Sequence, residues 1–223
     1  MTTIEAPLPR SLPARRPRRR RPWAPAWVLP TALILLSLVP MSAGSLRLAS
    51  LAGAVDVSAD LGAPPTPVPA LVAHIVGITV YVLLGALQFH RGLRRRRPRW
   101  HRIAGRVTVP AGVLASVSGI WLTLAAVGPG ANGALVVVRI AVGVAMVAAL
   151  VLGVLRALGR DLRAHRAWMV RAYALGQGAG THVFVLLGGE ALLGPLTGLT
   201  EAALFAAGWA INVAVGEWAI RRW

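Results

Sequence analysis

The chain has 223 residues, 56% of them hydrophobic, and a mean hydropathy of +0.65, which is too apolar for a soluble domain of this length. It has no cysteine, so disulfides, thiolate metal sites and iron–sulfur clusters are excluded. The formal net charge is +17, and all 24 basic residues are arginine.

Twenty-two of the 24 arginines fall in four clusters, and each cluster borders a long apolar stretch. The clusters cover residues 10–21, 91–106, 156–171 and 221–222. Alternate loops carry almost no positive charge, which is typical of a multi-spanning membrane protein whose basic loops stay in the cytoplasm. Because the arginines are not gathered on one face, we expect them to contact anionic lipid headgroups and we expect no nucleic-acid partner.

In chain order, residues 1–22 are rich in arginine and proline and are predicted to form a disordered cytoplasmic tail. Residues 23–223 are predicted to form an all-α, polytopic transmembrane helical bundle with both termini in the cytoplasm. The six predicted spans are 27–46, 69–89, 103–127, 134–155, 167–187 and 200–220. The first span also fits a signal peptide, and its cleavage would leave five spans.

The second and third spans resemble the fourth and fifth. His101-Arg102 and His165-Arg166 stand in equivalent loops at an offset of 64 residues, and Ala70-Leu71-Val72 recurs at the same offset. One interpretation is a parallel repeat of a helical hairpin, and the other is chance in a sequence rich in Ala, Val and Leu.

Small residues recur every four positions in two of the spans. They are Ala104, Thr108, Gly112 and Ser116 in the third span, and Ala172, Gly176 and Gly180 in the fifth. This spacing predicts closely packed helix backbones. Near the end of the sixth span, Glu217 is predicted to pair with Arg221. Arg139 in the fourth span is expected to snorkel outward or to pair with Glu190, Glu201 or Asp56.

Histidines form two layers along the predicted spans. His74 and His182 lie toward the outer face, whereas His90, His101 and His165 lie at the inner boundary. Such intramembrane residues are candidate functional groups, and the alternative is that they only hydrogen-bond between helices.

The outer pair is a candidate site for haem b, with His74 and His182 as the axial iron ligands and the glycines near them leaving room for the macrocycle. Arg171 would bind the propionates, and Tyr81 and Gln88 share the polar stripe of His74. A weaker inner site would use His101 and His165. Without haem, we expect the two outer rings to bond to each other or to Tyr81, Gln177 or Arg171.

Several motifs resemble the DUF2306 family of predicted bacterial membrane proteins over about residues 70–190. They are His74 with Gly77, Leu84-Gly85, Gln88-Phe89, His101-Arg102-Ile-Ala-Gly105-Arg106, and His165-Arg166-Ala-Trp168-Met169-Val-Arg171 with Tyr173-Ala174-Leu175. The resemblance implies a bacterial inner (cell) membrane location and carries no established activity. Its helical plan is similar in outline to membrane cytochromes of the b type, although the fourth span here has no histidine.

Three functions are compatible with this pattern. One is electron transfer through haem b, with a quinone or another redox partner. A second is a small-molecule transporter or channel lined by His74, Tyr81 and Gln88, although the sequence shows neither a broken helix nor a mid-span carboxylate. A third is a structural or accessory membrane protein without catalytic activity, whose polar residues only pack helices.

Overall fold

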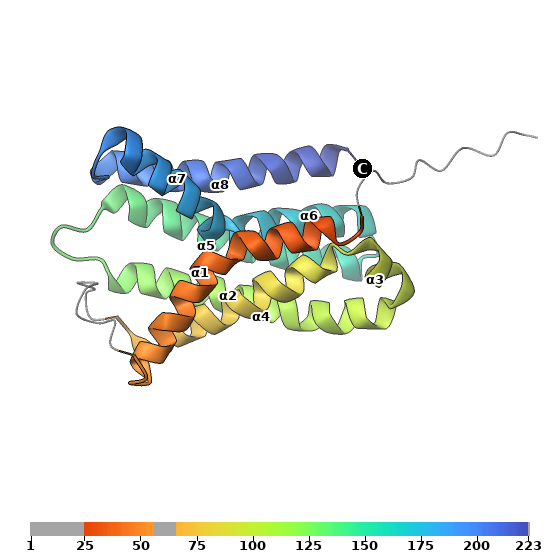
Figure 1. Cartoon of the computed structure of the whole chain (residues 1–223). Coiled ribbons are helices and arrows are strands. Elements are labelled where there is room, and N and C mark those ends of the chain that lie inside the picture. The colour runs from red at the N-terminus through yellow and green to blue at the C-terminus, as the bar shows by residue number, and fades with distance from the viewer. Residues whose placement is uncertain (1–24, 56–65, 223) are drawn as a thin grey trace, which may run out of the picture.

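The computed structural model describes residues 25–55 and 66–222, which fold into α-helices without any strand (Figure 1). The predicted tail, residues 1–22, and the acidic residues 56 and 60 lie outside the described residues. The helices are α1 (Val28–Leu51), α2 (Val68–Gln88), α3 (Arg91–Arg96), α4 (Pro98–Ala125), α5 (Gly133–Leu158), α6 (Leu162–Gly176), α7 (Gly178–Leu193) and α8 (Gly198–Arg221). The predicted all-α bundle is confirmed.

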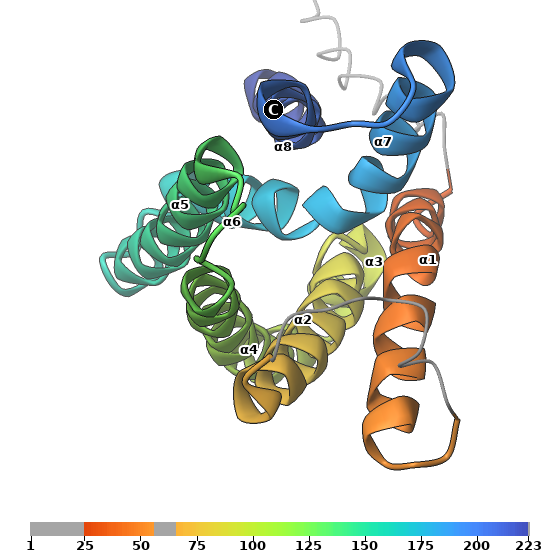
Figure 2. The same cartoon turned by 90° about the vertical axis from the view of Figure 1, so that its left-hand side faces the viewer.

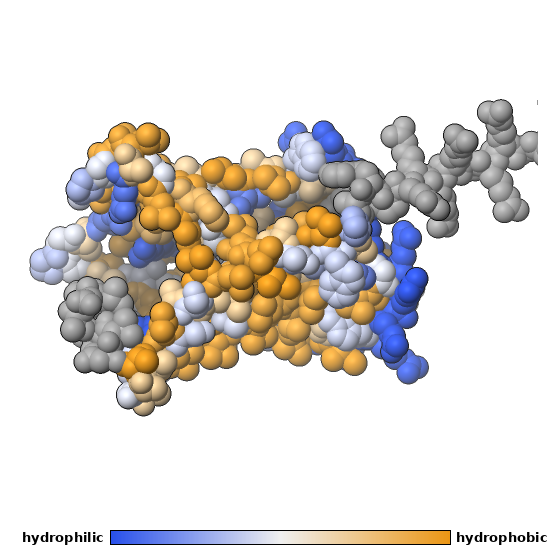
Figure 3. All heavy atoms as spheres, viewed as in Figure 1, coloured by the Kyte–Doolittle hydropathy of each residue, from blue (hydrophilic) through white to orange (hydrophobic). Residues whose placement is uncertain are grey.

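Five of these helices, α1, α2, α4, α5 and α8, are long and apolar enough to cross a membrane. On the face shown in Figure 3, apolar residues form a belt across the middle of the bundle, and strongly hydrophilic residues gather at one end. Large apolar side chains of the helices stay exposed, among them Val137 and Phe184, each at 66%. Exposure on this scale fits contact with lipid tails, so the chain is an integral membrane protein.

The fifth predicted span, 167–187, is two helices in series instead of one. The chain turns sharply at Gln177, where α6 ends and α7 begins (Figures 1 and 2). Their 15 and 16 residues each reach about 24 Å, less than the roughly 30 Å of a hydrocarbon core. The two half-helices therefore make this crossing together. An unbroken fifth span was the wrong expectation, because Gly176 and Gly178 weaken the helix on both sides of Gln177.

The two predicted hairpins are present, since α2 packs along α4 and α5 packs along α6. His101 and His165 each stand at the fourth residue of the returning helix. The hairpins differ elsewhere: the first contains the short helix α3, and only the second has a broken return. α1 lies at the edge of the bundle beside α2 and α7, and α8 contacts α5, α6 and α7 (Figure 2). Six crossings bring both described ends of the chain to the arginine-rich end (Figure 1).

Two tyrosine rings fill the centre of the bundle, and glycines on neighbouring helices make room for them. A Cβ added to Gly112 would lie 2.7 Å from the ring of Tyr81, and one added to Gly176 would lie 2.5 Å from its other edge. Gly85 receives Tyr173 in the same way, at 2.5 Å. Carbon atoms that are not bonded do not approach this closely, so these glycines are required by packing.

The small-residue face predicted for the third span is confirmed. Ala104, Thr108, Gly112 and Ser116 are all buried on α4. The fifth-span run is divided by the break, because Gly176 belongs to α6 and Gly180 to α7. Small side chains allow the close approach of α4 to α2, as expected where lipid gives no hydrophobic drive for helix association.

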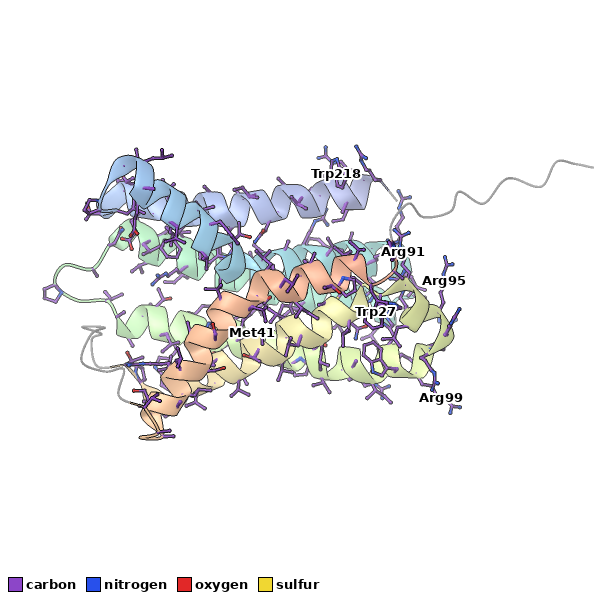
Figure 4. The ribbon with its side chains drawn as sticks, viewed as in Figure 1. Trp27, Met41, Arg91, Arg95, Arg99 and Trp218 are labelled. Atoms are coloured by element: carbon purple, nitrogen blue, oxygen red, sulfur yellow. The ribbon has the colours of Figure 1, made fainter. Side chains whose placement is uncertain are left out.

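The first helix bends near its middle. Pro40 lies inside α1, where its ring removes one backbone hydrogen bond, and the helix changes direction beside Met41 (Figure 4). Before the bend, Leu36 lies against Gly180 of α7, and after it, Gly44 lies against Ile75 of α2, so the bent helix contacts both neighbours.

Candidate functional site

Polar groups from several spans gather at the break between α6 and α7. The Gln177 side-chain amide donates to the Leu33 carbonyl at 3.0 Å and to Ser37 Oγ at 2.9 Å, which ties the break to α1. Ser37 is 3% exposed and Gln177 is 4% exposed, so these bonds lie in the interior. Buried polar groups of this kind require partners, and here they fix the position of α1 against the break.

A neighbouring helix satisfies one backbone carbonyl at the break. Trp209 Nε1 on α8 donates to the Leu175 carbonyl, one of the last of α6, at 3.1 Å. The same indole lies where a Cβ on Gly178 would be, 2.1 Å from its nitrogen. Gly180 likewise approaches the backbone of Leu36 on α1. The Trp209 bond replaces one hydrogen bond that a continuous helix would make in lipid, and the two glycines let α8 and α1 pack closely against the break.

Two polar atoms near the break have no hydrogen-bond partner in the described part of the chain. They are Gln177 Oε1, an acceptor, and Asn212 Nδ2, a donor. Asn212 is held from its other side, because Thr181 Oγ1 donates to Asn212 Oδ1 at 2.7 Å. An unpaired buried amide costs roughly 1–3 kcal/mol. A neutral ligand that both donates and accepts would satisfy the two atoms.

The outer histidines do not face each other. His74 Nδ1 donates to the Ala115 carbonyl on α4 at 2.8 Å, and His182 Nε2 donates to the Phe205 carbonyl on α8 at 2.9 Å. The expectation that the rings bond to each other or to Tyr81, Gln177 or Arg171 was therefore wrong. α2 packs mainly on α4 and α7 mainly on α8, because the break at Gln177 directs α7 away from α2.

The space around His182 is filled by protein. Its ring packs edge-on against Trp209, with the centroids 4.4 Å apart, and against Phe205 at 4.7 Å. A Cβ on Gly208 would lie 2.3 Å from the imidazole. Of the glycines expected to leave room for a macrocycle, Gly178 receives the Trp209 ring and Gly77 packs against the backbone of α4.

The other residues of the predicted outer site lie in different parts of the bundle. Tyr81 is 2% exposed within the aromatic core, whereas both amide atoms of Gln88 are buried without a partner near the arginine-rich end. Arg171 forms a two-pronged ion pair with Glu217 on α8, at 2.5 and 3.1 Å, and its guanidinium lies over the Trp168 ring. Glu217 therefore bonds to Arg171 instead of the expected Arg221, because tertiary packing brings α6 against α8.

The inner histidines do come together. His101 lies within electrostatic range of His165 and Arg94, as expected for matching positions on two adjacent hairpins. His165 Nδ1 donates to the Gly153 carbonyl at 2.7 Å, whereas His101 Nδ1 is buried without a partner in the described residues. In the described ranges no cluster of three His, Asp or Glu side chains is arranged to hold a metal ion.

Arg139 lies near the end opposite the arginine clusters. Its guanidinium covers the Phe205 ring at 5.0 Å and interacts with Glu201. Glu201 also accepts a hydrogen bond from Asn132 at 2.9 Å. Of the partners expected for Arg139, Glu201 is brought near, whereas Asp56 lies outside the described residues. Together these contacts attach α8 to the start of α5.

The family model described as "Predicted membrane protein (DUF2306)" matches residues 71–220, more than half of the chain. The chain belongs to the DUF2306 family. The match begins in α2 and extends through α8, beyond the 70–190 region in which the motifs occur, and it leaves out α1. No curated protein matches this DUF2306 chain, and no solved structure does.

Sequence reasoning missed the contribution of α8 to the site of this DUF2306 protein. Trp209 and Asn212 support the break, and Glu217 holds Arg171. The available signal was weak: a Trp and an Asn one helical turn apart inside an apolar span. The Gly-Gln-Gly run was the visible signal for the break itself.

Proposed function

We propose that this DUF2306 protein is a membrane transporter for a small neutral polar solute, and that the solute binds at the break between α6 and α7. The observation that carries the proposal is the interrupted span itself. Discontinuous helices in membrane proteins commonly form solute sites near the midplane, because their ends present backbone and side-chain polar groups to a ligand.

The chemistry at the break favours a neutral solute. The groups gathered there are the amides of Gln177 and Asn212 and the hydroxyls of Ser37 and Thr181. In the ion pair of Arg171 with Glu217, the two side chains form two hydrogen bonds with each other. A ligand with one donor and one acceptor, such as an amide or an alcohol, complements Gln177 Oε1 and Asn212 Nδ2.

We further propose the orientation of the bundle: the arginine-rich end faces the cytoplasm of a bacterial inner membrane, with both termini there. The support is the segregation of the arginines, since basic loops are retained on the cytoplasmic side. Figure 4 supports this reading, because Arg91, Arg95 and Arg99 lie together at one end and point away from the helices.

Single-cysteine labelling tests the transport proposal, and the chain is suited to it because it has no cysteine of its own. Ser37→Cys and Asn212→Cys place thiols beside the break. We expect a charged, membrane-impermeant methanethiosulfonate reagent to modify them from at least one side in oriented vesicles. Leu150→Cys, at a position only 1% exposed in the core, is the control that should stay unmodified.

Labelling of both site variants no faster than Leu150→Cys, from either side, would overturn the transporter proposal. It would favour the accessory protein, whose polar groups only pack helices. Labelling of the Leu150→Cys control would show that the bundle is opened by the substitution. Labelling of Ser37→Cys and Asn212→Cys would then no longer support the transporter proposal.

Electron transfer through haem b is the second candidate, and one contact favours it. The Nδ1–H bond from His74 to the Ala115 carbonyl selects the tautomer in which Nε2 can bind a metal. His182 bonds through Nε2 to the Phe205 carbonyl, and its ring packs against Phe205 and Trp209 on α8, so it does not face His74 as a second axial ligand would. Reduced-minus-oxidised absorption spectra of the wild type, His74→Ala and His182→Ala decide this: a haem band lost in both variants would replace the transporter proposal.

A further inference from the structure

A second group of buried polar atoms without partners in the described part of the chain lies at the arginine-rich end, away from the break. The last turn of α2, the helix α3 and the first turn of α4 enclose buried polar atoms that have no partner within the described residues. They are both amide atoms of Gln88, Nε2 of His90 and Nδ1 of His101. Native proteins leave few buried polar atoms without a partner, so these four atoms are candidates for binding a ligand at this end of the bundle.

His90 shows which chemistry is missing. It is only 8% exposed, and its ring lies against Trp27 with the centroids 4.1 Å apart. The backbone N–H of Leu93 donates to His90 Nδ1 at 2.8 Å, as the N-cap of α3. Since Nδ1 accepts, the proton of the neutral ring is on Nε2, and that buried N–H lacks an acceptor.

Among the described residues, the charges that act on Arg94 and His101 are positive. Arg94, half-buried on α3, interacts with Arg91 and Arg95 on its own helix, and with His101 and Arg166 from α4 and α6. No carboxylate in the described part of the chain pairs with Arg94. Burial and the neighbouring arginines lower the pKa of Arg94, which means that the charged form is destabilised where it stands. An anion would offset that repulsion.

We propose that α3 and the adjoining turns form a binding site for a phosphate group, with Arg94 as its central ligand and His90 and His101 as buried donors. Phosphate oxygens accept several hydrogen bonds at once and pair with guanidinium in a two-pronged geometry. The position at the polar end of the apolar belt selects the phosphodiester of an anionic lipid headgroup, and a soluble phosphate compound shares the same chemistry. This site does not depend on the transporter proposal.

The test measures retention of phosphatidylglycerol against phosphatidylcholine by native mass spectrometry on the full chain in detergent. Arg94→Gln should lower retention of phosphatidylglycerol about tenfold, as expected for the loss of a charge-assisted pair. Arg95→Gln and Arg99→Gln are the matched controls. They remove the same charge from side chains that point away from the bundle (Figure 4), and should change retention less than about twofold.

A second arm distinguishes the source of the phosphate. If the ligand is a soluble phosphate compound, inorganic phosphate should raise the melting temperature of the wild type, relative to chloride at matched ionic strength, and should not raise that of Arg94→Gln. If the ligand is a lipid, only the retention of phosphatidylglycerol should depend on Arg94. If Arg94→Gln does not fold, Arg94→Lys compared with Arg95→Lys replaces it, and only the former should lose retention. An equal loss in the Arg94 and Arg95 variants, or no dependence on Arg94 in either arm, overturns the proposal.

Discussion

At the scale of single residues, the glycines of this chain seat aromatic rings. Gly85, Gly112 and Gly176 each stand where a Cβ would enter a tyrosine ring, and Gly178 does the same for Trp209. In a bilayer, helix association depends on van der Waals packing. Here the packing is between the backbone of a glycine and the face or edge of an aromatic ring. The two buried tyrosines therefore determine how closely α2, α4 and α6 approach one another.

The first prediction concerns one of these glycines. Gly112→Ala should lower the free energy of unfolding by about 1–3 kcal/mol, because the new methyl group would enter the space of Tyr81. Gly105→Ala, on the same helix but with nothing within 4 Å of the added carbon, should be neutral or raise it by up to about 1 kcal/mol. Denaturant titration in detergent measures both. Equal losses would show that the tyrosine contact is not the cause.

At the scale of helices, the pair α6–α7 is the element on which the arrangement depends. The turn at Gln177 sends α7 toward α8 and α1, while α6 stays between α5 and α8. Both partners contribute hydrogen bonds to the break: Leu33 and Ser37 from α1, and Trp209 from α8. Half-helices joined by a short hinge are also the elements that move in alternating-access transporters, so the same feature serves packing and the proposed function.

The second prediction belongs to this element. The ion pair of Arg171 with Glu217 joins α6 to α8, and both side chains are about one-third exposed, at 32% and 28%. A double-mutant cycle with Arg171→Ala and Glu217→Ala should give a coupling energy of about 0.5–1 kcal/mol, because solvent screens a pair at this exposure. The measurement is thermal or denaturant unfolding at low salt. A coupling energy of zero would show that the pair does not stabilise the α6–α8 contact.

At the scale of the whole molecule, charged and apolar residues are segregated along the bundle. The arginines gather at one end, the apolar belt follows, and the opposite end carries turns with few charges (Figure 3). The even number of crossings returns the chain to the end where it begins (Figure 1). The proposed phosphate site and the proposed orientation are compatible, since anionic headgroups attract basic residues at the cytoplasmic face.

The third prediction is the topology. Reporter fusions after Asn132 and Gly194 should report an external location, and fusions after Arg96 and Arg160 a cytoplasmic one. Alkaline phosphatase and green fluorescent protein give opposite signals on the two sides, so each position is measured twice. Reversal at two or more of the four positions would contradict the orientation.

The sequence by itself determined the fold class, the apolar segments and the family. Segments of about 20 apolar residues have few alternatives in a bilayer, and the motifs around His101 and His165 lie within the segment that the DUF2306 model matches. It also placed the buried face of α4, because Ala104 and Thr108 follow the four-residue spacing of a packed helix. These properties are local, or depend only on periodicity and charge.

Tertiary structure decided which spans are neighbours and therefore which polar groups meet. His74 and His182 have similar predicted depths, yet they bond to Ala115 and Phe205 on different helices. Depth along a helix follows from residue number, whereas the direction of a side chain depends on the rotation of each helix and on the turn at Gln177. That turn is stabilised by distant residues on α1 and α8, and no local pattern in the sequence specifies those contacts.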